Sequence, residues 1–415
     1  ALAAYLLAPW LYLIPALLII KLYEIPNRIK TIREARNILS GNPNLIVIGI
    51  TGSYGKTTVK EMLKTVLTKK YKVLSTPKSF NTLFGISQVI KEQLKPEHEI
   101  FIVEMGAYKI GEIAELCRMV KPKIGILTGI TNQHLERFGS EENIIKAKYE
   151  LIESLPISGL AVINIDSIPC RDIYSKTKLS KVGYSRDGQA DISATGVSTS
   201  ILVNMPLIKF GVIVNSSTLR SAEVLNGLEL KVPGEHNVSN ALAAIAIALY
   251  LNVPTEKIRS ALSEVNSPEH RLQIITNPNG TVIVDDAYSS NKEGARAAIN
   301  LVKKFANKPK IIVTPGLVEL GKAQFEENKN LGELIAENFD FAVIVNKTNY
   351  QSLLSGLKES GWVEESVSSK EKPSSSVLAP IVAQTLEYRK LIFTADNLEK
   401  VTAKVSYDKF QPISQ

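Results

Sequence analysis

Residues 49–63 read GITGSYGKTTVKEML, and this stretch decides the fold. The apolar run LIVIGI leads into its glycines and apolar residues at helical spacing follow them, so the glycines lie between an expected strand and an expected helix. A glycine-rich turn in that position points successive backbone N–H groups into one concavity at the positive end of a helix. Phosphate oxygens fit such a concavity. The stretch therefore predicts a nucleotide-binding loop.

The side chains of this loop have expected roles. Gly52 and Gly55 allow the backbone to approach a phosphate closely. Lys56 supplies a point charge for the outer phosphates, and the Thr57 hydroxyl is placed to bind Mg²⁺. The pattern G-x-x-x-x-G-K-[ST] asks for glycine at position 50, where this chain has Ile50. A glycine-containing surface turn is the alternative. The residues expected to contact the nucleotide here are Thr51, Gly52, Ser53, Gly55, Lys56, Thr57 and Thr58.

Composition bounds the function classes. The 415 residues suffice for two domains of ordinary size. The formal net charge is +8, but the Lys and Arg residues are scattered and no dense basic cluster with interleaved aromatic residues occurs. We therefore expect no nucleic-acid partner, and we expect a monomer. Two cysteines, Cys117 and Cys170, cannot form a Cys₄ zinc site, and a disulfide between them is not expected in a cytosolic ATP enzyme.

The N-terminus departs from this composition. The first 20 residues, ALAAYLLAPWLYLIPALLII, carry no charge and are long enough to cross a bilayer. We expect a transmembrane helix over residues 1–22 and a basic juxtamembrane linker over residues 23–43, whose positive charges favour the cytoplasmic side. This predicts a protein at the cytoplasmic membrane with its catalytic domains facing the cytoplasm. A buried helix is the alternative, and the number of spans upstream of Ala1 is open.

The rest of the chain has an α/β pattern. From residue 44 short apolar runs alternate with helical patterns, which predicts a parallel sheet wrapped by helices. Residues 170–232 are rich in Ser and Thr, with short β-like segments and no convincing helix, which predicts an antiparallel insertion. Turn residues near 273–280 precede a second α/β series. We expect a P-loop-type ATPase domain over 44–273 and a Rossmann-like C-terminal domain over 274–415.

Three residues outside the loop are candidates for chemistry. Glu104 closes the apolar run IFIVE, and in an open parallel sheet ligands bind at the carboxyl ends of strands. A Mg²⁺ shared with the nucleotide explains a carboxylate there, and a solvated strand end is the alternative. His134 follows the run KIGILT. Lys148 occupies the middle of an apolar helical stripe, where a charged lysine rarely stays unpaired; its alternative is to reach solvent at the helix edge.

These motifs together resemble the Mur ligase family, most closely the type that adds D-alanyl-D-alanine to a muramoyl tripeptide. The stretch TGSYGKTT resembles the family's ATP loop, and EMGAYKIGEIAEL resembles its Mg²⁺-binding strand end. The segment HLERFGSEENIIKAKYEL is similar to the one that carries a metal-binding histidine and a carbamylated lysine. GEHNVSNALAA resembles the adenine-binding helix start, HRL the nucleotide-contacting arginine, and DDAYSSN the opening of the C-terminal domain.

The resemblance implies a role for each matching residue. Thr57 and Glu104 would hold a first Mg²⁺, and Glu104, His134 and carbamylated Lys148 a second, because a CO₂ adduct turns a cationic amine into an anionic oxygen ligand. The implied catalytic residues are Lys56, Lys148 and His134. The implied nucleotide contacts beyond the loop are His236, Asn237, Asn240, Arg271, Asp286 and Tyr288.

The implied activity is ATP-dependent ligation in cell-wall biosynthesis. A substrate carboxylate would attack the γ-phosphate to give an acyl phosphate, and an amine would then expel phosphate. The partners would be a cell-wall precursor and an amino-acid or dipeptide acceptor such as D-Ala-D-Ala, with ATP, two Mg²⁺ ions and CO₂ as a lysine carbamate. The resemblance implies a UDP-recognising N-terminal domain, and we expect it to be absent here because about 44 residues precede the first expected strand. The alternatives are a family ligase for another carboxylate, such as a folate, a poly-amino acid or a lipid-linked or archaeal wall precursor, and a non-catalytic membrane-attached nucleotide-binding module.

Overall fold

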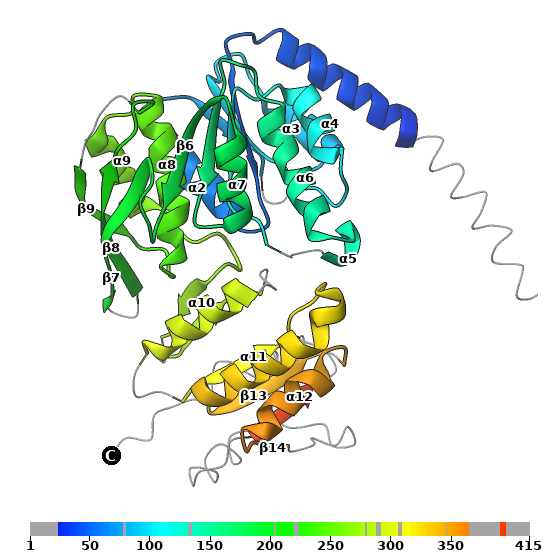
Figure 1. The fold of residues 1–415 in the computed structure, drawn as a ribbon, viewed down its shortest axis with the longest axis vertical. Coiled ribbons are helices and arrows are strands. Elements are labelled where there is room, and N and C mark those ends of the chain that lie inside the picture. Colours follow the sequence, from blue (N-terminus) through cyan, green and yellow to red (C-terminus); the bar gives the residue numbers. More distant parts are fainter. Residues whose placement is uncertain are drawn as a thin grey trace, which may run out of the picture.

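A computed structural model describes residues 24–77, 80–131, 135–202, 205–219, 224–278, 280–287, 292–305, 309–345, 347–364 and 391–395. Two sheets with their covering helices organise these residues (Figure 1). The larger sheet has nine strands in the order β2-β3-β1-β4-β5-β6-β7-β8-β9. Its pairs are parallel from β2 through β7, whereas β8 runs antiparallel to β7 and β9.

The strands of the larger sheet are β1 (Ile46–Thr51), β2 (Val73–Ser75), β3 (Ile100–Glu104), β4 (Ile124–Leu127), β5 (Leu160–Asn164), β6 (Ser180–Ser185), β7 (Ile192–Leu202), β8 (Met205–Val214) and β9 (Val224–Leu230). The helices around it are α2 (Lys56–Leu67), α3 (Leu83–Gln93), α4 (Glu112–Val120), α5 (Leu135–Phe138), α6 (Glu141–Glu153), α7 (Ile168–Lys176), α8 (His236–Tyr250) and α9 (Thr255–Glu264).

Helices cover both faces of the larger sheet. Apolar side chains of α2, α8 and α9 form one core with one face of the strands, and those of α3, α4, α6 and α7 form a second core with the other face. The two cores follow from strand alternation, since Ile48 and Ile50 of β1 lie in the first core and Val47 in the second. Figure 1 shows α8 and α9 on the side of the sheet opposite to α4 and α6.

The second part of the chain builds a separate parallel sheet of four strands in the order β12-β13-β15-β14. A short antiparallel pair, β10 and β11, precedes it. The elements are β10 (Gln273–Thr276), β11 (Val282–Asp285), α10 (Lys292–Lys303), β12 (Ile311–Thr314), η1 (Gly321–Ala323), α11 (Gln324–Asn338), β13 (Phe341–Val345), α12 (Tyr350–Glu359), β14 (Val363–Glu364) and β15 (Leu391–Ala395). A third apolar core, with Leu331, Ile335 and Leu353 among its members, joins α11 and α12 to this sheet.

The expected parallel sheet with helices on both faces is present, but residues 170–232 differ from their prediction. This stretch contains most of helix α7, whose N-terminal turn carries Pro169, and the parallel strand β6. The antiparallel strands β7 to β9 extend the same sheet and do not form a separate layer. Helix α7 was missed because only Cys170 and Ile173 of its residues are buried, which leaves a weak apolar pattern in the sequence.

The prediction of a membrane helix, and with it of a location at the cytoplasmic membrane, is wrong by the structure. In the part of the chain that the structure describes, no helix combines the length and the apolar character needed to cross a bilayer. Residues 1–22, on which the prediction rested, lie outside the described residues. The expected basic linker is largely a helix over 24–40, because its apolar side chains recur at helical spacing and pack on the core beside α3 and α4, as with Ile32, Ala35 and Ile38.

Leu151 of α6 packs closely against two strands of this sheet. A Cβ added to Gly49 would lie 2.8 Å from Leu151 Cδ1, and one added to Gly125 would lie 3.2 Å from Leu151 Cγ, so the leucine fills the space that two strand glycines leave. We expect Leu151→Ala to lower the free energy of unfolding by about 2–5 kcal/mol in urea titrations. Ile157→Ala is the control, because Ile157 is 85% exposed. A loss below about 1 kcal/mol for Leu151→Ala would contradict this packing.

Candidate active site

The predicted phosphate loop joins β1 to α2 at the carboxyl end of the larger sheet. Gly55 has a φ of +79° directly before the first residue of α2, a conformation that favours glycine. Gly52 has a φ of +151°, and a Cβ there would collide with the hydroxyl of Thr128. Both predicted glycines are therefore required by backbone geometry. The Thr51 hydroxyl donates to Met105 O at 3.0 Å and fixes the start of the loop.

The segment after β4 holds the loop in place. Ser53 N donates to Gly129 O at 2.7 Å, and the Ser53 hydroxyl donates to Thr131 O at 3.2 Å while it accepts from Thr131 N at 3.1 Å. Thr128 Oγ1 donates to Thr51 O at 3.3 Å and also to Tyr54 O. These bonds fix the loop through protein contacts, so its geometry is pre-organised.

Lys56 reaches across this loop. Its Nζ donates to Gly52 O at 2.7 Å and to Ser53 O at 3.3 Å. Burial lowers the pKa of Lys56; the nearby Glu104 carboxylate opposes this shift and the Arg271 guanidinium adds to it. The ammonium therefore lies at the loop, close to one carboxylate and to a second cation from a distant part of the chain.

Glu104 faces helix α2. Strand alternation places its side chain on the same face of β3 as Ile100 and Ile102, which pack in the core with α2. Its Oε1 accepts from the Thr57 hydroxyl at 3.2 Å, and its Oε2 accepts from Lys60 Nζ at 3.1 Å. Glu104 is 3% exposed, so this strand-end carboxylate is not a solvated one.

Lys148 is buried in the second core. Its side chain is 4% exposed, which excludes the alternative in which it reaches solvent at the helix edge. Burial, together with the charge of Lys56, lowers the pKa of Lys148 to about 7 against the opposing charges of Glu112 and Glu150. Among the residues that the structure describes, its Nζ has no hydrogen-bond or ion-pair partner and lies 5.8 Å from the centre of the Phe138 ring. A large fraction of this amine is neutral at pH 7.

Glu150 connects the helix of Lys148 to the segment that follows Glu104. Its carboxylate accepts from Gly111 N at 2.5 Å and from Ala114 N at 2.9 Å, which satisfies backbone donors at the start of α4. A carboxylate at a helix N-terminus is also favoured by the helix dipole. The loop after β3 is therefore held against α6 by a buried charge-assisted contact.

The start of α8 lies against the phosphate loop. A Cβ on Gly55 would lie 2.7 Å from Asn240 Oδ1. Asn240 Nδ2 donates to Asn237 Oδ1 at 2.8 Å, and Asn237 Nδ2 donates to Pro233 O at 2.6 Å, so both side chains are buried in one chain of hydrogen bonds. The His236 side chain, at the first position of the helix, is exposed.

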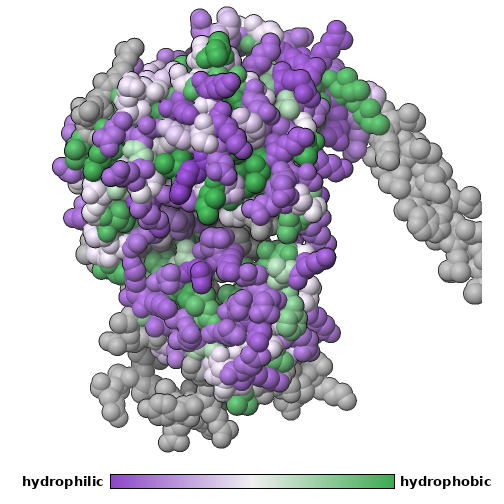
Figure 2. Space-filling model, viewed as in Figure 1, coloured by the Kyte–Doolittle hydropathy of each residue, from purple (hydrophilic) through white to green (hydrophobic). Residues whose placement is uncertain are grey.

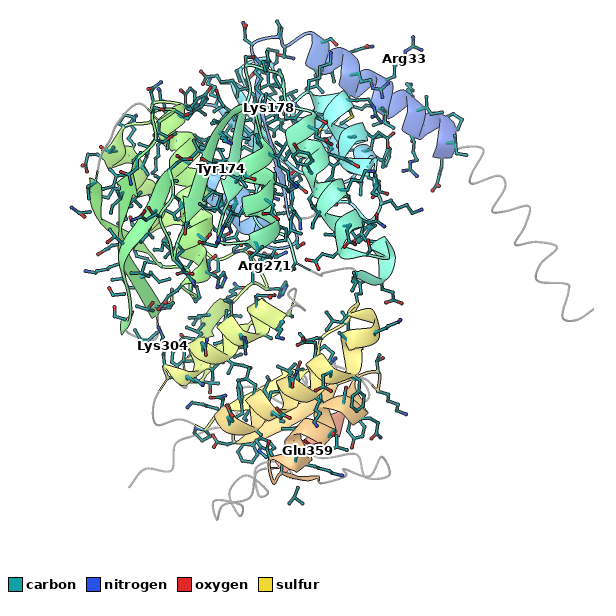
Figure 3. All side chains as sticks on the ribbon, viewed as in Figure 1. Arg33, Tyr174, Lys178, Arg271, Lys304 and Glu359 are labelled. Carbon is teal, nitrogen blue, oxygen red and sulfur yellow. The ribbon has the colours of Figure 1, made fainter. Side chains whose placement is uncertain are left out.

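Residues from the link to the second sheet reach the same region. Leu272 N donates to Asp286 Oδ1 at 3.0 Å, which joins the segment of Arg271 to the end of β11. Figure 3 shows Arg271 between the larger sheet and α10. Arg137 of α5 pairs with Glu319 at 3.1 Å, and Lys304 pairs with Glu235 at 3.6 Å, so ion pairs connect the two parts. The surface around this junction is largely hydrophilic in the view of Figure 2.

The donor atoms suit a magnesium ion that arrives with phosphate. Thr57 Oγ1 and Glu104 Oε1 are hard oxygen donors 3.2 Å apart. Within the described residues no three His, Cys, Asp or Glu side chains gather into a metal-holding group. The protein therefore offers only part of an octahedral shell from these side chains, and phosphate oxygens and water can complete it.

Comparison with known proteins identifies the family. The family model of the Mur ligase middle domain matches residues 50–248, the segment that carries the phosphate loop, Glu104, Lys148 and the start of α8. The chain belongs to the Mur ligase family.

A curated relative and a solved structure show what this Mur ligase is similar to. The UDP-N-acetylmuramoyl-tripeptide–D-alanyl-D-alanine ligase of Mycobacterium tuberculosis is 32% identical over 296 residues, which cover 70% of this chain and 56% of that relative. The chain thus spans little more than half the length of that protein. A crystal structure of MurF from Acinetobacter baumannii superposes with a TM-score of 0.72 at 26% identity, covering 91% of this chain and 80% of that one.

A third relative shares the fold. The MurF ligase of Thermotoga maritima, solved in complex with ADP, superposes with a TM-score of 0.70 at 22% identity, covering 91% of this chain and 83% of that one.

The structure places most of the predicted site residues at one edge of the larger sheet. Two of them, His134 and Tyr288, lie outside the described residues. Sequence reasoning missed Lys60, Glu150 and Thr128. A lysine among Val59, Met62 and Leu63 is the same signal that singled out Lys148, a charge within an apolar helical stripe, and it points to Lys60 as well.

The lowered pKa of Lys148 predicts a specific pH dependence of stability in this Mur ligase. The folded amine titrates near 7 and the unfolded amine near 10.5, so the unfolded state binds more protons between these values and stability rises with pH there. In buffer free of CO₂, a change from pH 7 to pH 9 should raise the free energy of unfolding of the wild type by about 2 kcal/mol more than that of Lys148→Met. Urea unfolding at both pH values measures this gain. Lys146→Met, an exposed lysine on the same helix, should follow the wild type; equal pH dependence of wild type and Lys148→Met would contradict the burial argument.

Proposed function

We propose that this Mur ligase is an ATP-dependent amide ligase that works through an acyl phosphate. We further propose that it adds an amino acid or a dipeptide such as D-Ala-D-Ala to a cell-wall peptide precursor. The observation that carries the proposal is the meeting of a phosphate loop, the Thr57–Glu104 oxygen pair and the buried Lys148 at one sheet edge. The name of the 32% identical relative supports the substrate pair.

ATP occupies the phosphate loop in this proposal. Loop amides and Lys56 bind its β- and γ-phosphates at the N-terminus of α2. The start of α8, with His236, Asn237 and Asn240, faces the adenine. Arg271, from the link between the two parts, and Asp286 and Tyr288, from the second part, contact the ribose and phosphates. The ADP complex of the Thermotoga maritima ligase supports a nucleotide as the ligand of this fold.

Two Mg²⁺ ions would complete the site in this proposal. Thr57 and Glu104 would hold the first, and Glu104, His134 and carbamylated Lys148 would hold the second. When bound, the ions neutralise charge on the phosphoryl oxygens. The carbamate forms when the neutral Lys148 amine attacks CO₂: a C–N bond forms, a nitrogen proton leaves to water, and an anionic oxygen results. A pKa of about 7 supplies the neutral amine that this addition needs.

The chain's own residues then stabilise the reaction. A substrate carboxylate attacks the γ-phosphorus and displaces ADP, and the acyl phosphate formed is attacked by the acceptor amine, which expels phosphate. Lys56 stabilises the negative charge that develops on the transferring phosphoryl group. The loop amides, already fixed in place, bind its oxygens without reorganisation. Domains over 44–273 and 274–415 would enclose the acyl phosphate and exclude water. The ion pairs that join the two parts support such a closed arrangement.

Two other functions are alternatives to this proposal. A family ligase for another carboxylate would use the same ATP-dependent chemistry at this sheet edge and would differ only in its substrates. A nucleotide-binding module without ligation has no use for a buried lysine with a pKa near neutrality, so Lys148 disfavours it. The three interpretations differ in which molecules phosphate release requires.

Phosphate release therefore tests the function. We expect release from ATP to require both UDP-N-acetylmuramoyl tripeptide and D-Ala-D-Ala, and Lys56→Ala to reduce it by at least about 10³-fold because the loop loses its charge for the transferring group. Lys64→Ala, an exposed lysine of the same helix, is the control and should keep wild-type rates. ATP turnover that does not change when both substrates are added would favour the binding module. Phosphate release that occurs only when another carboxylate replaces the tripeptide substrate would favour the other ligase.

Labelled bicarbonate tests the carbamate. ¹³C NMR of the protein equilibrated with ¹³C-bicarbonate should show a carbamate signal that is absent in Lys148→Ala and present in Lys146→Ala. Lys148→Ala should be nearly inactive, and acetate or formate should restore part of the activity by filling the vacated oxygen position. A wild-type spectrum without the signal would refute the carbamate.

A further inference from the structure

The buried ion pair between Lys60 and Glu104 is a part of this edge that the proposed mechanism does not use. Their side chains are 0% and 4% exposed, and Nζ lies 3.1 Å from Oε2. Lys60 follows Lys56 by one helical turn, so both ammonium groups lie on the side of α2 that faces the strand ends. Glu61 Oε1 lies 3.7 Å from the same Nζ but is partly exposed.

This pair decides which oxygen of Glu104 faces the nucleotide loop. Lys60 takes Oε2, and Thr57 donates to Oε1. Thr76 Oγ1 accepts from the backbone N–H of Glu104 at 3.1 Å and fixes the end of the strand. With both oxygens and the backbone held, the carboxylate has one orientation. Only Oε1 lies beside the hydroxyl of Thr57, in the first turn of α2.

The pair also sets the charge of the donor group. Glu104 contributes −1 and Lys60 contributes +1, and the charge of Glu61 is screened by solvent because that side chain is 35% exposed, so Thr57 and Glu104 offer a divalent cation little net charge. Lys56 adds a further positive charge nearby. Buried charges interact strongly because water screens them little. A divalent cation is therefore held weakly until phosphate oxygens supply the missing negative charge.

We propose that Lys60 is a positioning residue: it is the built-in counter-ion of Glu104, which aims Oε1 at Thr57 and makes divalent-cation binding at this carboxylate depend on the nucleotide. The proposal rests on the proposed function only for the identity of the nucleotide site. In this arrangement the Mg²⁺ held by Thr57 and Glu104 would enter with ATP and leave with the product nucleotide, because those two side chains alone would not retain it.

Mn²⁺ titration of nucleotide-free protein, followed by EPR of the free ion, tests this dependence. Lys60→Met keeps the length of the side chain and removes its charge, so nucleotide-free Mn²⁺ affinity should rise by about tenfold or more over the wild type. Lys60→Met combined with Glu104→Gln should lose that gain. Lys64→Met, an exposed lysine one turn further along α2, should bind Mn²⁺ as the wild type does. Unchanged nucleotide-free affinity in folded Lys60→Met overturns the proposal, since a merely structural lysine alters thermal stability only.

A second variant tests the proposal without any change at Lys60. Glu104→Gln should leave nucleotide-free Mn²⁺ binding unchanged and weaken Mn²⁺ binding in the presence of ADP by about tenfold or more. A fall in nucleotide-free binding in Glu104→Gln would show that the carboxylate holds the ion without nucleotide and would overturn the proposal. These titrations contain neither the carboxylate substrate nor the amine substrate. Their outcome is therefore independent of the phosphate-release assay, and the proposal on Lys60 can be refuted even where the proposed ligase activity is found.

Discussion

The parallel pairing of β1 with β3 is the constraint on which the site depends. Its register sets Ile50 opposite Glu104, so the strand that leads into the phosphate loop and the strand that ends in the carboxylate finish at the same level. Alternation along β3 then turns Glu104 toward α2, where Thr57 and Lys60 reach its two oxygens. A slip of one residue would turn the carboxylate into the opposite core. The chemistry of this edge thus depends on the backbone hydrogen bonds that set the register of the two strands.

Several basic side chains gather at this edge. Lys56, Lys60 and Lys148 approach the loop from two helices on opposite faces of the sheet, and Arg271 adds a fourth cation near Lys56. Glu104 is matched by Lys60, and Glu150 is engaged by the backbone of α4. A polyanion such as a nucleoside triphosphate suits this group of cations. Burial, and after it the charge of Lys56, lowers the pKa of Lys148.

Sequence reasoning identified the loop, the strand-end carboxylate and Lys148, because each leaves a local pattern: glycines between strand and helix, an acid after an apolar run, a lysine inside an apolar stripe. It missed Glu150, since its partner is 39 residues away and the contact rests on helix packing. Lys60 was missed although it lies in an apolar helical stripe, and its partner, 44 residues away, depends on strand register. Helix α7 was missed because it buries few residues. The predicted membrane helix falls on residues 1–22, outside the described residues. In the part of the chain that the structure describes no helix could cross a bilayer, and the adjoining basic stretch is a helix packed on the core.

The central claim is that a substrate carboxylate is phosphorylated at this edge before the amide forms. The direct measurement uses a substrate whose reacting carboxylate carries ¹⁸O at both oxygens, with mass analysis of the phosphate released during ligation. The account predicts that one ¹⁸O atom appears in each phosphate, because the carboxylate oxygen that attacks the γ-phosphorus leaves with it. Ligation with phosphate free of ¹⁸O would contradict it.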